Sequence, residues 1–228
     1  MLQKRFDKAS KLIKTGDKKY KEECAVLQKL LDHMQDGAPA RTLDLTEEEK
    51  EIVKGFSLLT QKPIIYAANV EEDALQDVEN NALVEQVKQA AAKEGAEVVV
   101  VSAKVEEELS QLEEEERALF LSELGLPSAG LDRLVEASYR LLGLISYLTA
   151  GPKEVRAWTI EKGTKAPQAA GKIHSDFEKG FIRAEIVSYD DLIECGSIAA
   201  AREKGLYRSE GKEYVIQDGD VVLFRFNV

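Results

Sequence analysis

The sequence contains few of the residues that build metal centres and disulfide frameworks. Its 228 residues include two cysteines, Cys24 and Cys195, and two histidines, with the members of each pair far apart. Neither pair has the spacing of a zinc site or of a disulfide framework. We therefore expect no metal site, and isolated thiols of this kind are typical of a cytosolic protein.

Long apolar segments are also missing. The longest apolar stretch runs from Leu141 to Tyr147, whereas a membrane-spanning helix needs about twenty residues. The N-terminal residues 1–7 have no apolar run after their basic residues, as a signal peptide would. We expect no membrane partner and a cytoplasmic location.

A phosphate-binding loop is the third absence. No segment fits the pattern G-x-x-x-x-G-K-[ST], which holds nucleotide phosphates with backbone N–H groups and a lysine. The nearest approach, Gly171-Lys172, is followed by Ile173 where a hydroxyl residue is required, and residue 166 is alanine. We therefore expect no catalytic residues and no ATP or GTP hydrolysis by this chain alone.

Acidic residues exceed basic ones, but unevenly. The net charge is −11 overall, and residues 1–60 sum to +1, residues 61–150 to −11 and residues 151–228 to −1. The middle third therefore carries the whole excess of negative charge, which makes general nucleic-acid affinity improbable there. Hydrophobic residues make up 44% of the sequence, as in a soluble globular protein.

The hydrophobic periodicity predicts an α/β protein with a helical N-terminal segment. Residues 1–36 have the spacing of a helical hairpin that breaks at Thr15-Gly16-Asp17, and Thr46 begins a capping box for a helix through about Leu59. Lys62 to Ala68 and Val98 to Val101 are typical of buried parallel strands, with a crossover helix between them over 82–94. A further helix is expected over 131–148.

The remaining residues predict a small mixed sheet that packs on a helix. Strands are expected at 155–160, 181–187, 213–216 and 221–226, a helix at 167–173, and short helices near 189–194 and 198–204. Gln217-Asp218-Gly219-Asp220 is a tight-turn sequence. We expect three parts: a coiled-coil arm at 1–60, half of a nucleotide-binding domain at 61–148, and a C-terminal domain at 149–228.

Two short loops follow the two buried strands. Asn69-Val70-Glu71-Glu72 follows the first, and Ser102-Ala103-Lys104 follows the second. An open α/β sheet presents ligand-binding residues at the carboxyl ends of its parallel strands. On spacing alone, however, an asparagine in this place is more often a turn former or a helix cap.

The order of these parts resembles the YchF family, the Obg-like ATPases of the translation-factor class of P-loop NTPases. Residues 151–159 (GPKEVRAWT) and 171–185 (GKIHSDFEKGFIRAE) resemble its TGS domain, a ubiquitin-like β-grasp module. The resemblance extends over essentially the whole chain. It implies ATP as the nucleotide and the ribosome, including ribosomal RNA, as the partner of the coiled coil and the TGS domain. In that family the P-loop, the Mg²⁺ ligand and both switch regions precede the helical hairpin, so Mg²⁺ is expected only together with them.

The resemblance also implies roles in base recognition. Asn69 bonds the outer edge of the purine with its amide, Val70 packs on the ring face, the Ser102 hydroxyl braces the first loop, and the Ala103 N–H faces the base. Glu72 replaces the aspartate of guanine-specific sites. Its side chain is one methylene longer, which relaxes the selection of guanine by about a few kcal/mol or less.

An alternative from another class of protein is a non-enzymatic interaction module, in which a helical arm and a β-grasp domain bind protein or RNA. The two loops are then plain turns. Two further motifs have structural interpretations. His174, Ser175 and Asp176 are the residue types of a catalytic triad, but three neighbours in sequence seldom form one. Glu113–Glu116 is most simply a solvated helix face.

Overall fold

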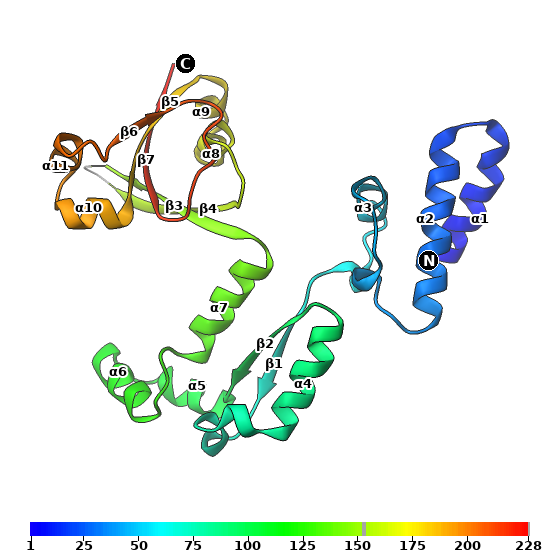
Figure 1. Ribbon diagram of the computed structural model, residues 1–228, viewed down its shortest axis with the longest axis horizontal. Coiled ribbons are helices and arrows are strands. Elements are labelled where there is room, and N and C mark those ends of the chain that lie inside the picture. The colour runs from blue at the N-terminus through cyan, green and yellow to red at the C-terminus, as the bar shows by residue number, and fades with distance from the viewer. Residues whose placement is uncertain (152–153, 228) are drawn as a thin grey trace. The chain divides into compact units, whose positions relative to one another are not determined.

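The computed structural model describes residues 1–151 and 154–227 and divides into two compact units, Met1–Ala137 and Ser138–Val228 (Figure 1). The predicted boundary segment includes Pro152 and Lys153, which lie outside the described residues. An α/β fold of mixed sheets and helices is confirmed. The predicted three-part division of the chain stays a proposal.

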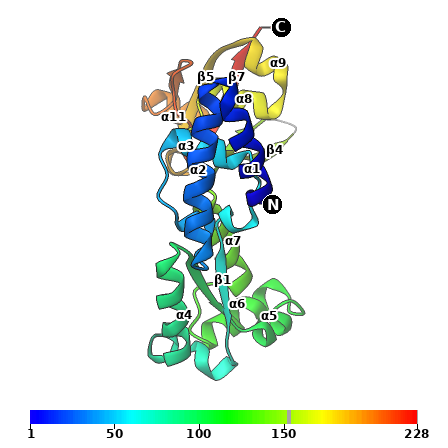
Figure 2. The same ribbon diagram turned by 90° about the vertical axis from the view of Figure 1, so that its right-hand side faces the viewer.

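The first unit begins with the predicted helical hairpin. Helix α1 (Leu2–Leu12) and helix α2 (Lys18–Gln35) lie side by side in Figure 2. Gly16, with φ +84°, reverses the chain between them, and the Asp17 side chain caps α2 by accepting a hydrogen bond from the Lys19 N–H at 2.9 Å. The facing apolar side chains are buried: Leu2, Ala9, Val26, Leu27 and Leu30.

Helix α3 (Glu47–Lys54) starts at the predicted capping box, in which Thr46 and Glu49 satisfy each other's backbone N–H groups. Its predicted extension to Leu59 is wrong, because the helix ends at Lys54. Phe56 then turns into the core of the arm and is 1% exposed, while Ser57 adopts a positive φ of 52°. Burial of the Phe56 ring therefore takes precedence over another helical turn.

The predicted parallel pair of strands completes the middle of this unit, but the first strand begins at Ile65 rather than Lys62 and includes Asn69. Strands β1 (Ile65–Asn69) and β2 (Glu97–Val101) pair in register from Ile65 opposite Glu97 to Asn69 opposite Val101. Helix α4 (Ala82–Lys93) connects them and is capped by the Asn81 side chain. Within the described residues this sheet has two strands.

Three helices follow β2: α5 (Ala103–Leu109), α6 (Glu114–Glu123) and α7 (Gly130–Leu141). The expectation of one helix over 131–148 is wrong beyond Leu141. Gly143, at φ +61°, ends the helical run, and residues 144–150 form strand β3 (Leu144–Ala150). Apolar residues at 144, 145 and 148 fit either structure, so only the tertiary pairing of β3 decides between them.

The second unit is built on a five-stranded mixed sheet in the order β4-β3-β7-β5-β6. Its further strands are β4 (Val155–Glu161), β5 (Phe181–Ser188), β6 (Arg208–Glu210) and β7 (Asp220–Phe226). The β3–β7 pair is parallel and the other pairs are antiparallel. Helix α8 (Ala166–Ile173) covers one face, where Tyr147, Ile186 and Phe224 are buried against its alanines.

Short helices complete this unit: α9 (Ser175–Lys179), α10 (Tyr189–Cys195) and α11 (Ile198–Glu203). The predicted strand at 213–216 is wrong. Its backbone makes one isolated bridge, Val215 to Lys165, whereas the unpredicted β6 pairs with β5. The predicted turn before β7 is present, with Gly219 at φ +77°. No helix among the described residues is long and apolar enough to span a membrane.

Candidate functional site

The two predicted loops meet at the carboxyl ends of β1 and β2. The Ala103 N–H donates a hydrogen bond to Oδ1 of Asn69 at 2.9 Å, and the Val70 N–H donates to the Val101 carbonyl oxygen at 2.8 Å. Parallel strands in register end side by side, so residues 34 positions apart become neighbours. The structure thus brings together the loops that the sequence singled out.

The backbone N–H of Ala103 has a partner that differs from the expected one. We expected the Ser102 hydroxyl to brace the first loop and the Ala103 N–H to face the base. The Ala103 N–H instead donates to the side-chain oxygen of Asn69, a contact that joins the two loops, and the brace by Ser102 stays a prediction. Ser102 lies below the surface at 2% exposure. Asn69 is exposed, and its amide nitrogen, a hydrogen-bond donor, takes no part in the bond to Ala103.

Glu72 has a cationic partner within the site. The Lys104 ammonium lies 3.4 Å from the Glu72 carboxylate, and this hydrogen bond raises the pKa of Lys104. The carboxylate that we expected at the guanine-selecting position is therefore paired with a lysine of the neighbouring loop. Both side chains are partly exposed, so their electrostatic attraction is weakened by solvent.

An apolar hollow of about 450 Å³ lies beside the first loop. Asn69 and Val70 line it together with Val84 and Val87 of α4. Its volume falls in the range of about 300–1,000 Å³ that is typical of small-molecule sites. Glu72, Ser102 and Ala103 do not line this hollow, so it gathers two of the five predicted residues.

Sequence reasoning missed one carboxylate near this site. Glu106 of α5 accepts hydrogen bonds from the N–H groups of Gly130 at 2.6 Å and Leu131 at 3.1 Å, at the start of α7. A Cβ at position 130 would lie 2.7 Å from Glu106 Oε1 and 2.9 Å from Val101 Cγ1, so a larger residue there would require these side chains to shift. The only sequence signal was a glycine directly before an apolar helical pattern.

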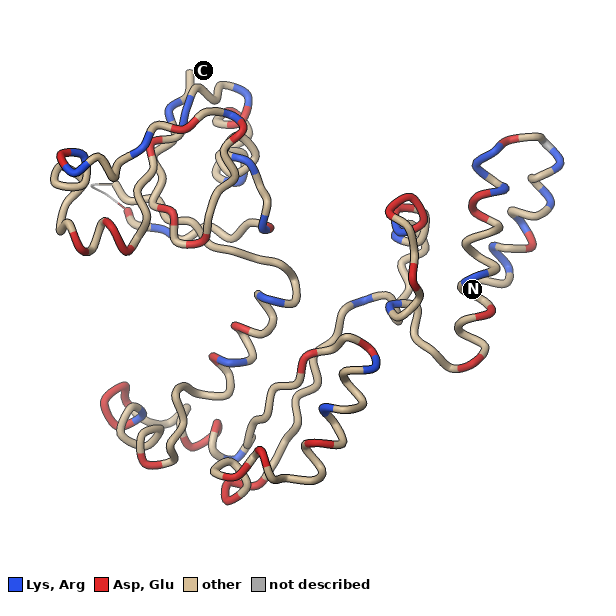
Figure 3. Tube along the Cα trace, in the orientation of Figure 1, with Lys and Arg blue, Asp and Glu red and all other residues tan. Residues whose placement is uncertain are grey.

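The basic residues of the arm are concentrated in the first 21 residues of the sequence. Residues 1–21 contain eight Lys or Arg and two Asp, a net charge of +6 in a chain whose net charge is −11. Figure 3 shows these cations along α1, the turn and the start of α2. Among the described contacts, two of the eight have carboxylate partners: Arg5 with Glu23, and Lys18 with Glu22.

Other candidates have structural roles. His174 Nδ1 accepts a hydrogen bond from the Asp176 N–H and caps α9, which fits the structural role expected for it. Over residues 1–151 and 154–227, no group of three or more His, Cys, Asp or Glu side chains could hold a metal ion.

Comparison with known proteins places these features in a family. A family model named YchF-GTPase_C, described as a protein of unknown function (DUF933), matches residues 144–227. The chain is 54% identical over 227 residues to "Ribosome-binding ATPase YchF" of Bacillus subtilis and 51% identical over 221 residues to that of Escherichia coli O157:H7. These matches cover 100% and 97% of this chain, and 62% and 60% of the relatives.

Solved structures agree with the sequence relatives. The "Structure of the Schizosaccharomyces pombe YchF GTPase" superposes with a TM-score of 0.86 at 34% identity, covering 98% of this chain and 61% of that one. A GTP-binding protein from Pyrococcus horikoshii, at 20% identity and a TM-score of 0.53, shares the fold. The chain thus spans about three-fifths of the length of its relatives, and it belongs to the YchF family.

Proposed function

We propose that this chain carries the base-recognition part of a purine-nucleotide site, together with ribosome-contacting surfaces, of a ribosome-binding ATPase. The observation that carries the proposal is the hydrogen bond between Asn69 and Ala103, which joins the two loops at the carboxyl ends of β1 and β2. The curated relatives bear the name ribosome-binding ATPase, which supports both halves of the proposal.

Base recognition follows from the donors and the apolar surface beside the junction. With its carbonyl oxygen engaged, Asn69 offers its amide N–H groups to acceptor atoms on the edge of a purine. Val70 and Val84 line the adjacent hollow and supply apolar surface for the ring. Such a site combines a few placed polar groups with an apolar wall, as small-molecule sites commonly do.

Selection of adenine over guanine follows from Glu72. A guanine-selecting carboxylate must accept two N–H groups of the base, but Lys104 engages the Glu72 carboxylate within the protein. Guanine would have to share the Glu72 carboxylate with Lys104, while adenine, which offers no such pair of donors, leaves the ion pair unchanged. We therefore propose ATP as the preferred nucleotide, with Mg²⁺ bound only when a phosphate-binding loop is present.

Ribosome contact is assigned to the helical arm, which we propose as a coiled coil, and to the C-terminal unit, which we propose as a β-grasp (TGS) domain. The charge of +6 over residues 1–21 supports the arm as a surface for RNA phosphates. Lys4, Lys8 and Lys11 share one face of α1 because residues three and four apart are neighbours on a helix.

Nucleotide binding is tested by calorimetry with ATP and GTP, on this chain and on a longer form extended upstream to include a phosphate-binding loop. We expect binding only by the longer form, with ATP preferred. In that form Asn69→Ala should weaken ATP binding about tenfold through the loss of one ligand bond and of the contact that joins the two loops. The matched control is Asn80→Ala, whose side chain bonds Asp77 outside the site.

Each outcome decides between the two classes of function. If the longer form binds neither nucleotide, or if Asn69→Ala and Asn80→Ala bind ATP equally well, the loops are structural turns and the interaction module is correct. Hydrolysis of ATP by the present chain alone would contradict the expected lack of turnover.

Ribosome association is tested by co-sedimentation with ribosomal subunits at two salt concentrations. A variant with three lysines of α1 replaced by glutamine should sediment less, and a charge-matched variant of the middle segment should behave like the parent. The first carries changes at Lys4, Lys8 and Lys11, and the second at Lys62, Lys88 and Lys93. Equal sedimentation of both variants would remove the arm from the proposal.

A further inference from the structure

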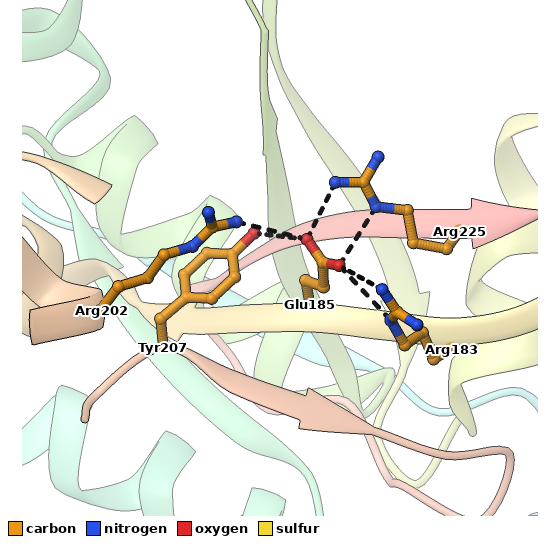
Figure 4. Close-up of polar contacts among 5 residues, drawn as sticks. All are labelled: Arg183, Glu185, Arg202, Tyr207 and Arg225. Atoms are coloured by element: carbon orange, nitrogen blue, oxygen red, sulfur yellow. Dashed lines mark hydrogen bonds and ion pairs between the residues drawn. The ribbon is translucent and has the colours of Figure 1, made fainter. Parts of the chain in front are cut away.

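A carboxylate on the C-terminal sheet is surrounded by guanidinium groups. Glu185 of β5 is 7% exposed, and Arg225 of β7 binds it through two N–H groups, Nε at 3.2 Å and Nη2 at 3.1 Å. Arg183 donates from Nη2 at 3.1 Å, and Arg202 of α11 lies 3.5 Å away. Figure 4 shows the three arginines arranged around the one carboxylate.

The cluster faces away from the main core of the unit. Residues alternate along a strand, so Arg183 and Glu185 project opposite Ala184 and Ile186, which are buried in the core beneath α8. Tyr207 completes the arrangement: its hydroxyl donates to Glu185 at 3.1 Å, and the Arg202 guanidinium lies 4.4 Å from the centre of its ring. The sheet and α11 therefore fix the positions of all three arginines.

The charges in this cluster do not cancel. One carboxylate faces three guanidiniums, which leaves a local charge of +2. The arginine side chains are 51%, 55% and 48% exposed, so their remaining N–H groups reach solvent. Nη1 of Arg183 and Nη1 of Arg225 take no part in the bonds to Glu185. An anion that lies over the cluster would meet several oriented donors at once.

We propose that Arg183, Arg202 and Arg225 form a binding site for the phosphate groups of an RNA strand, with Glu185 as the residue that positions them. This inference rests on the proposed ribosome association and assigns a particular surface and ligand chemistry to it. Planar guanidiniums match the geometry of phosphate oxygens. Phosphate contacts of this kind position an RNA strand without reading its sequence.

The geometry favours RNA phosphates over an acidic protein. Interfaces between proteins concentrate their binding energy in buried aromatic and apolar anchors. The one aromatic ring in this cluster, Tyr207, is engaged with Glu185 and Arg202 within the protein. The cluster therefore offers a partner charge and directional N–H donors, and Leu223, which lies opposite Glu185 on β7 and is 43% exposed, is an apolar neighbour.

The test is fluorescence anisotropy of a labelled twelve-nucleotide single-stranded RNA with the whole chain, at several salt concentrations. Arg183→Gln, Arg202→Gln and Arg225→Gln combined should weaken binding about tenfold and reduce the slope of log K against log salt by about 2, since each phosphate contact on a single strand contributes about 0.7. A charge-matched control, with Lys162, Lys172 and Lys179 changed to Gln, should keep the slope of the parent.

Folding and ligand class need their own comparisons. Arg202→Gln alone serves as a second variant, because Arg202 makes the longest of the three contacts to Glu185, and it should lower the slope by about 0.7. Arg→Lys at all three positions keeps the charge but loses the planar fork, so it should also weaken RNA binding. Urea unfolding of each variant confirms that it is folded.

Three results would overturn the proposal. The first is an equal salt slope for the triple Gln variant and the lysine control, and the second is full RNA binding by the Arg→Lys variant. The third is displacement of the labelled RNA by polyglutamate as effectively as by unlabelled RNA of the same charge. Failure of this inference is distinguishable from failure of the proposed function. If the parent and the triple variant co-sediment equally with ribosomes, the arginine site is absent, while ribosome association stands on other surfaces.

Discussion

Replacement of Glu185 by glutamine tests the electrostatics of the arginine cluster through the stability of the C-terminal unit. Glutamine has nearly the same shape as glutamate but no negative charge, so the three guanidiniums would face one another without their counter-ion. Removal of one partner from a buried charge cluster is destabilising, because the remaining charges are left uncompensated. We therefore expect Glu185→Gln to destabilise the unit at neutral pH.

The size of the effect follows from the protonation of Glu185. Hydrogen bonds from Arg225, and then from Arg183 and Tyr207, lower its pKa from 4.5 to about 2, against the opposing effect of burial. This difference corresponds to an upper limit of about 3 kcal/mol in the free energy of unfolding. Because the three arginines are about half exposed and screened by solvent, we expect about 1–2 kcal/mol.

The pH dependence has a definite sign. In the unfolded chain the carboxyl group binds a proton near pH 4.5, and in the folded chain only near pH 2. Its stabilisation is therefore complete above about pH 4.5 and is lost as the pH falls toward 2. About three-fifths of this stabilisation is lost between pH 6 and pH 3, so the stability difference between the parent and Glu185→Gln should shrink by about 0.6–1.2 kcal/mol over that range.

Urea unfolding followed by tryptophan fluorescence measures this difference. Trp158 is the single tryptophan of the sequence and lies on β4, so its emission reports on the C-terminal unit. Glu194→Gln, an exposed change on α10 of the same unit, controls for the general loss of a carboxylate. If the difference between the parent and Glu185→Gln is the same at pH 6 and pH 3, the reasoning about Glu185 is refuted.

Three further substitutions test packing and capping. Gly180→Ala would bring a Cβ into the carbonyl oxygen of Asn227 and should cost about 1–3 kcal/mol by Trp158 fluorescence, whereas Gly211→Ala, in open space, should cost far less. Tyr147→Phe removes a buried hydrogen bond to the Ala169 carbonyl oxygen (2.9 Å), and the same assay should show a loss of about 1–2 kcal/mol; an unchanged urea midpoint would contradict this. Thr46→Ala removes the capping box of α3, so amide hydrogen exchange in the first turn of this helix should become faster, and the free energy of protection should fall by about 1 kcal/mol.

Sequence patterns predicted the fold where local signals agreed with tertiary pairing. The break at Gly16, the capping box at Thr46 and the turn at Gly219 all lie where they were expected, because each depends on backbone chemistry within a few residues. The error over 144–148 arose because the apolar spacing fits both a helix and a strand. Strand β6 was not predicted, because the polar sequence Arg208-Ser209-Glu210 forms a strand only by pairing with β5.

The candidate base site was predictable in position but not in detail. Topology places the ends of β1 and β2 together, so the meeting of Asn69 with Ala103 followed from the strand assignments. Which atoms bond there depends on side-chain rotamers that no spacing fixes. The arginine cluster was missed for another reason, since its members come from β5, α11 and β7 and converge only after the sheet has formed.

The position of β7 has a consequence for synthesis of the chain. This strand is the last of its sheet in sequence, yet it lies between β3 and β5 and joins them. While residues 144–210 leave the ribosome, Tyr147 and Ile186 lack Phe224 and the other β7 side chains that cover them in the folded unit. Long-range pairing of this kind slows folding and leaves apolar strands exposed in the nascent chain. Substitutions that weaken β7 should therefore reduce the yield of folded protein in cells more than its equilibrium stability suggests.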